Sequence, residues 1–147
     1  MSGTGALVVA HVGATFVMVG VIWMVQLVHY PLFAEVGEAT FRHYHEQHVQ
    51  RITWIVGPAM LVELGTGVWL AMKTPEHTDA WTWWVALGLL GVAWVTTATL
   101  SVPMHNKLAA GFEPQAHSLL VSTNWIRTAA WSLRGALVVW ALGKMLG

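Results

Sequence analysis

The amino-acid sequence alternates between long apolar runs and short polar connections. Each run has about the 20 mostly apolar residues that a membrane-spanning helix needs. Few polar side chains interrupt the runs, and most charged residues lie between them. The pattern therefore predicts an all-α fold: an integral membrane four-helix bundle that forms a single domain over residues 1–147. The predicted spans cover residues 6–30, 52–72, 81–102 and 119–146.

The polar connections predict how the spans join. Residues 35–51 contain no proline and one glycine, so we expect a helix that starts just after Gly37 and continues into the second span. The second connection, residues 73–79, contains Pro75 and is expected to be a loop. The third connection, residues 104–115, contains a glycine and a proline and is also expected to turn.

A short internal repeat favours a bundle built from two helical hairpins. The first span ends on Tyr30-Pro31 and the third span ends on Val102-Pro103. The two hairpins would run the same way across the membrane. The prolines are expected to kink the helix ends and to free backbone carbonyls there.

Composition and charge narrow the class of protein further. The chain is 56% hydrophobic and 10% charged, against about 25% charged residues in a typical soluble domain. Its net charge is zero, which argues against a nucleic-acid partner and leaves the lipid bilayer as the expected surroundings. The chain has no cysteine, so thiolate ligands, disulfides and iron–sulfur clusters are excluded.

The distribution of basic residues predicts an orientation. Arg42, Arg51 and Lys107 flank the first and third connections, whereas Lys73 and Lys144 lie at the opposite side. Because cytoplasmic flanks carry the excess of Lys and Arg, the first and third connections are expected in the cytoplasm. The predicted location is the plasma (inner) membrane, with both termini outside.

Histidines gather on that same predicted side. Six of the eight histidines lie near the first and third connections, at similar sequence distances from the turns at Gly37 and Gly111. Residues equally far from a hairpin turn lie at the same depth, so imidazoles from different helices could meet in one layer, as metal sites in bundles do. The candidate metal ligands are His29, His45, His48 and His105. His117 could belong to the same layer, and His43 and His77 are expected to be solvated.

A second polar layer is expected deeper in the bundle. His11, Glu63 and Arg134 lie on three different spans at comparable depth. Ionisable side chains at such depth must face the interior and find partners, so Glu63 and Arg134 are the preferred ion pair. The three residues are candidates for catalysis or proton transfer, and a purely structural buried pair is the alternative.

The donor set limits the possible cofactor. Imidazole nitrogens suit Fe, Cu or Zn, whereas Ca²⁺ and Mg²⁺ prefer oxygen ligands. Haem b is the other possibility, with His11 or His29 as an axial ligand and Arg127 or Arg134 as the partner of the propionates. Such a haem would be noncovalent, because no CxxCH motif is present.

Two families share short stretches with this sequence. His11, Trp23, Tyr30-Pro31-Leu32-Phe33 and Pro58-Ala59-Met60 resemble the first half of the HemJ-type protoporphyrinogen oxidases, which are small four-helix haem-associated membrane proteins. The lysine that this family has in its third span has no counterpart between residues 81 and 102. The stretch Pro103-Met104-His105-Asn106-Lys107-Leu108, with Trp125 and Arg134, is similar to the anthrone-oxygenase-like membrane proteins. Both resemblances imply a four-helix redox-type membrane scaffold.

Three functions are therefore compatible with the sequence. The leading hypothesis is a membrane-embedded oxidoreductase or oxygenase-like enzyme that uses a histidine-bound metal or haem on a lipophilic substrate. The second is a proton- or ion-conducting or transport element, which would act as a homo-oligomer because four helices are few for a transporter. The third is a non-catalytic membrane metal-binding protein.

Overall fold

The computed structural model describes residues 3–147, so the first two residues of the predicted domain lie outside it. These residues form helices and no strand, which confirms the all-α prediction. In chain order the elements are α1 (Gly3–Met24), η1 (Val25–His29), η2 (Pro31–Glu35), α2 (Glu38–Met72), α3 (Ala80–Thr96), η3 (Thr97–Ser101), α4 (Val102–Leu108) and α5 (Pro114–Leu146).

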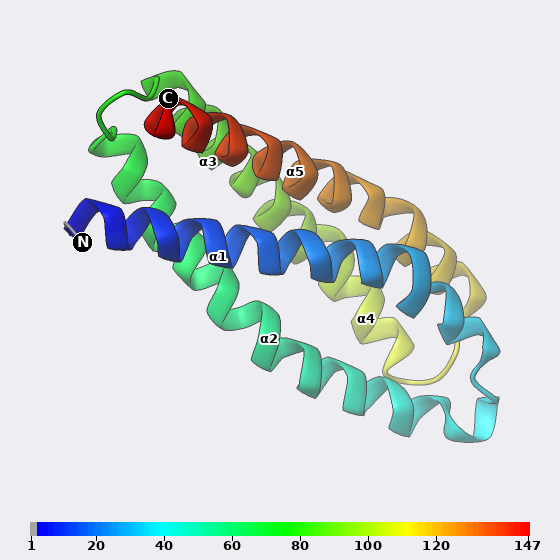
Figure 1. Ribbon diagram of the computed structural model, residues 1–147. Coiled ribbons are helices and arrows are strands. Elements are labelled where there is room, and N and C mark those ends of the chain that lie inside the picture. The colour runs from blue at the N-terminus through cyan, green and yellow to red at the C-terminus, as the bar shows by residue number, and fades with distance from the viewer. Residues whose placement is uncertain (1–2) are drawn as a thin grey trace.

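The elements form long helical columns that run alternately in opposite directions (Figure 1). One column is α1 with η1, the next is α2, the third is α3 continued by η3 and α4, and the last is α5. α1 packs against α2 and α5, and α3 packs against the same two helices. The N- and C-terminal ends of the described chain therefore lie at one end of the bundle, together with the connection between α2 and α3 (Figure 1).

The connections agree with the sequence pattern in position, and the second, between Met72 and Ala80, also has the predicted length. α2 begins at Glu38, directly after Gly37, as expected. The third connection is shorter than predicted, because α4 continues to Leu108 and α5 starts at Pro114. Gly111 lies in this turn with a φ of 150°, a backbone conformation that favours glycine.

Within residues 3–147, three helical stretches are long and apolar enough to cross a membrane: Gly3–Glu35, Glu38–Met72 and Ala80–Leu108. The sequence pattern predicted a fourth in residues 119–146. α5 is long enough, but its inner face carries Asn124, Arg127, Thr128 and Arg134, all buried. These buried polar side chains lower its apolar character without exposing charge on the outside of the bundle.

The outside of the bundle is more apolar than its interior in many places. Large apolar side chains point outward along each column, including Trp54 (82% exposed), Leu61 (63%) and Val95 (61%). Polar side chains such as Glu63 and Asn124 are fully buried. Exposed apolar surface on this scale marks a face that contacts another protein or lipid.

Two matching π-helical turns lie at the same level of the bundle. η1 is followed by Tyr30 and then Pro31, and η3 is followed by Val102 and then Pro103. In both, the N–H of the residue before proline bonds the carbonyl five residues earlier, from Tyr30 to Val25 and from Val102 to Thr97. Proline has no N–H and its ring crowds the carbonyl four residues before it, so a wider turn accommodates it. The short repeat in the sequence is thus a repeat of local structure.

Candidate functional site

Four imidazoles meet at the end of the bundle opposite the chain termini. His29 Nε2 lies 2.7 Å from His48 Nδ1, and His45 Nε2 lies 3.0 Å from His105 Nδ1. The ring centres of His48 and His105 are 5.7 Å apart, which joins the two pairs into one group. We call these four residues the histidine cluster. Its members come from η1, α2 and α4, so three columns that are distant in sequence contribute to it.

Aromatic side chains hold the histidine cluster in place. Phe33, which is fully buried, has its ring centre 5.2 Å from those of both His29 and His48. Phe41 stacks on His45 at 5.8 Å. The Tyr30 hydroxyl lies 2.9 Å from His105 Nε2, so both nitrogens of that imidazole have partners. These contacts leave the rings little freedom to turn away from one another.

The histidine cluster is buried on one side and reachable on the other. His45 and His48 are 2% and 8% exposed, whereas His29 and His105 are half-buried. A hollow of about 550 Å³ borders His29 and His48, and another of about 720 Å³ borders His45 and His105. An ion or small molecule in solution can therefore reach both pairs.

The other histidines take different positions. His117 Nε2 lies 2.8 Å from the Tyr30 carbonyl oxygen and packs against Phe112, beside the histidine cluster rather than within its hydrogen bonds. His43 is exposed and borders both hollows. His77 lies in the connection between α2 and α3, at the far end of the bundle.

The imidazoles pair with each other instead of facing one common point. Across residues 3–147, no three or more His, Asp or Glu side chains are arranged as the ligands of a metal ion. The nitrogens that face each other in the two pairs are those that an ion placed between them would use. The structure thus supplies four nitrogen donors in one place, arranged as two hydrogen-bonded pairs.

A cavity of about 200 Å³ lies on the interior side of the histidine cluster. His48 and His105 form part of its wall, and the rest is mostly aliphatic side chains from α1, η1 and α2. Arg127 of α5 also borders this cavity. Its Nη1 donates to Ser101 Oγ at 3.0 Å and to Asn124 Oδ1 at 3.2 Å, and its guanidinium lies over the Trp131 ring.

Several residues of this region were not identified from the sequence as functional. Asn124 Nδ2 donates to Gln26 Oε1 at 2.9 Å, so the Arg127 contacts continue across the bundle into η1. Tyr30, Gln26 and Ser101 were missed as site residues. Gln26 and Asn124 do interrupt apolar runs, and that interruption was the available signal. Tyr30 and Ser101 lie at the ends of such runs, where polar side chains are ordinary.

The deeper layer comes together as the sequence predicted. Arg134 Nη2 lies 3.4 Å from Glu63 Oε1 and 3.1 Å from His11 Nε2, and these side chains are at most 1% exposed. Trp131 Nε1 donates to Glu63 Oε2 at 3.0 Å. Because the guanidinium can only donate, His11 Nε2 accepts, and His11 Nδ1 donates to Thr66 Oγ1 at 2.7 Å. The layer therefore holds one cation, one anion and a neutral imidazole.

The guanidinium of Arg134 is not fully satisfied by the described residues. Its Nε and Nη1 have no hydrogen-bond partner there, although the side chain is 1% exposed. Each of these buried N–H groups costs free energy unless water reaches it. The layer is well suited to fix the register of α1, α2 and α5. None of its three side chains lines the interior cavity or the hollows at the two ends of the bundle.

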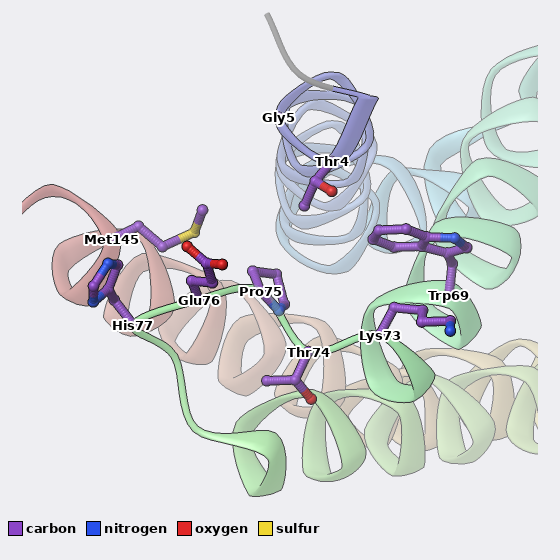
Figure 2. Close-up of a pocket in the computed structure, with 9 residues that line it drawn as sticks. All are labelled: Thr4, Gly5, Trp69, Lys73, Thr74, Pro75, Glu76, His77 and Met145. Carbon is purple, nitrogen blue, oxygen red and sulfur yellow. The ribbon is translucent and has the colours of Figure 1, made fainter.

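A separate hollow of about 700 Å³ lies at the terminal end of the bundle. Figure 2 shows Glu76 and His77 on the Met145 side of this hollow, with Trp69 and Lys73 opposite. It is far from the histidine cluster and shares no lining residue with the interior cavity. Most of the polar side chains around it belong to the exposed connection between α2 and α3.

Comparisons with known proteins identify no relative. No family model, no curated protein and no solved structure matches this chain.

Proposed function

We propose that this chain is a membrane-embedded oxidoreductase or oxygenase-like enzyme whose histidine cluster binds one Fe, Cu or Zn ion. The lipophilic substrate would occupy the adjoining interior cavity. The single observation that carries the proposal is the meeting of four imidazoles from three columns beside a largely apolar cavity.

The spacing of the imidazoles supports an ion in this position. Two nitrogens bound to one tetrahedral ion at about 2.0–2.1 Å lie about 3.3 Å apart. The facing nitrogens are 2.7 Å apart in one pair and 3.0 Å apart in the other, so the pair that holds the ion needs to open by only about 0.6 or about 0.3 Å. A third ligand would come from the neighbouring pair, and the Tyr30 hydroxyl would orient His105 as outer partners of metal-bound histidines do.

The donor chemistry favours Fe, Cu or Zn, and a redox role favours Fe or Cu among them. We favour a single metal ion over haem b because of the size of the interior cavity. About 200 Å³ is less than the ~300–1,000 Å³ of pockets for drug-sized ligands, and a tetrapyrrole is larger than such ligands. The residues expected to hold a haem also already contact protein side chains: His11, His29, Arg127 and Arg134.

The membrane arrangement belongs to the same proposal. Three apolar columns and the outward-facing apolar side chains support a bundle of two hairpins, α1–α2 and α3–α5, in a lipid bilayer. We propose the plasma (inner) membrane, with the histidine cluster at the cytoplasmic face because Arg42, Arg51 and Lys107 lie on that side. A relationship to HemJ-type or anthrone-oxygenase-like proteins remains a proposal based on the short stretches quoted above.

Metal content tests the proposal directly. Protein purified in detergent is analysed for Fe, Cu and Zn and by visible spectroscopy, as the original chain and as His48→Ala, His105→Ala, His43→Ala and His77→Ala variants. We expect about one ion per chain, which is lost in His48→Ala and His105→Ala. The two control variants should retain it, because His43 and His77 lie outside the histidine cluster and contribute no ligand. Metal-free protein after growth with each metal, or equal loss in all four variants, would contradict the proposal.

A second candidate function is a proton- or ion-conducting element that acts as a homo-oligomer. The observation that favours it is the buried layer of Glu63, Arg134 and His11, which lies deeper in the bundle than the Gln26–Asn124 contacts. Ionisable groups at this depth are typical of ion and proton paths. Flux into proteoliposomes that disappears in Glu63→Gln would favour conduction over the enzyme. Metal binding without turnover or flux would favour a non-catalytic metal-binding protein.

A further inference from the structure

The interior cavity has two chemically different parts. Most of its wall is aliphatic, with Ile22, Val25 and Val56 among the lining residues. The remainder carries polar groups, chiefly Arg127, Ser101 and two members of the histidine cluster, His48 and His105. Exposed lining residues on α2 and α4 show that the cavity opens sideways between these two helices: Val49, Thr53, Val102 and Asn106.

Arg127 places an unbalanced positive charge at the polar part. None of the residues that line the cavity is Asp or Glu, and the partners of the Arg127 guanidinium are all neutral. They are the side chains of Ser101, Asn124 and Tyr30, together with the Trp131 ring. The side chain is 8% exposed, and its Nε has no hydrogen-bond partner among the described residues. Arg134, about two turns further along the same face of α5, instead has the Glu63 carboxylate beside it.

A buried cation that has no carboxylate partner costs free energy unless a bound anion pairs with it. A guanidinium with free N–H groups matches a carboxylate or phosphate best, because its planar fork donates two parallel hydrogen bonds. The aliphatic walls disfavour a small hydrated anion, and the modest volume excludes a large ring system.

We propose that the interior cavity binds a lipophilic monocarboxylate of modest size, a medium-chain fatty acid, with its carboxylate on Arg127 and its chain against the aliphatic wall. A role for this fatty acid as the substrate would rest on the enzymatic function proposed above. The binding site itself depends on Arg127 and on the cavity, and not on a metal ion.

Equilibrium dialysis of radiolabelled octanoate tests this proposal. Chelator-treated, metal-free protein in nanodiscs is compared with empty nanodiscs, so failure of metal binding does not affect the result. We expect saturable binding of about one octanoate per chain, with octanol and acetate at least about tenfold weaker as competitors. Octanol lacks the charge and acetate lacks the chain, so each comparison tests one part of the cavity.

Variants locate the binding. Arg127→Gln is expected to weaken octanoate binding by about tenfold or more, whereas Arg51→Gln, which removes an exposed cation, should leave it unchanged. Val56→Phe fills the cavity and keeps Arg127, so it should abolish binding without changing the metal content. This variant decides the question if Arg127→Gln does not fold.

Three results would overturn the proposal. Non-saturable uptake equal to that of empty nanodiscs would mean partition into lipid only. Equal competition by acetate would mean a small-anion site. Unchanged binding in folded Val56→Phe would place the octanoate elsewhere on the protein.

Discussion

At the scale of single residues, the two buried arginines of α5 differ in what surrounds them. Arg134 has the Glu63 carboxylate at 3.4 Å, whereas Arg127 contacts neutral side chains. The sequence predicted the first pairing, since both groups are ionisable and lie equally deep. It could not predict the surroundings of Arg127, because Ser101 and Asn124 carry no charge and so do not call for an ionic partner.

The Glu63–Arg134 pair is expected to stabilise the fold only as a pair. Arg134→Met or Glu63→Gln alone leaves the other group buried without its partner, so each should lower the free energy of unfolding by about 3–5 kcal/mol. The double variant should lose clearly less than the sum of the two. Reversible unfolding in mixed micelles measures all three.

The chain offers a matched control for this cycle. Lys144 and Asp79 form an exposed ion pair at 2.6 Å, so Lys144→Met should cost less than about 1 kcal/mol. Additive losses at Glu63 and Arg134, within about 0.5 kcal/mol, would show that the two side chains do not depend on each other.

At the scale of elements, the sequence predicted the helices and their levels better than their local geometry. Long apolar runs indicated the columns, and the distances of His29, His45, His48 and His105 from the turns predicted that they lie together, as they do. The π-helical turns could not be predicted, because a helix can accommodate proline by kinking, ending or widening. The widened turns set the direction in which η1 and α4 present His29 and His105.

Pro103→Ala is expected to alter the histidine cluster while leaving the helix intact. Without the proline ring, η3 can revert to α-helical hydrogen bonds, and one surplus residue rotates α4 by about 100°. His105 would then leave His45 and Tyr30. We expect loss of bound metal with unchanged helical circular dichroism.

Pro58→Ala is the control for this change, because Pro58 lies inside α2 and follows no π-helical turn. It should retain the metal. If Pro103→Ala also retains it, the widened turn does not position His105.

At the scale of the whole molecule, polar side chains lie along the axis and apolar side chains cover the outside. This arrangement follows from the sequence only in part. The apolar runs indicate a membrane protein, but the faces of α5 become clear only when Asn124, Arg127 and Arg134 are seen on one buried side. If the bundle spans a membrane as we propose, the two ends of the α3–α4 column lie on opposite sides of the bilayer.

Single cysteines test this orientation cleanly, because the chain has none of its own. Thr74→Cys and Ala109→Cys are both at exposed positions, one at each end of the α3–α4 column. In intact cells, a membrane-impermeant maleimide should label Thr74→Cys and should reach Ala109→Cys only after lysis. The reverse pattern would contradict the cytoplasmic placement, and labelling of both in intact cells would contradict the crossing.

The hidden polar face of α5 also has a consequence for how the protein is made. Each arginine near the middle of a lone helix costs about 2.5–3.5 kcal/mol on transfer from the translocation machinery into lipid. Arg127 and Arg134 lie on a helix that emerges from the ribosome after α2 and η3, the segments that supply Glu63 and Ser101 as their partners. In the arrangement that we propose, α5 would therefore enter the bilayer from the translocon only while it packs against α1 and α3.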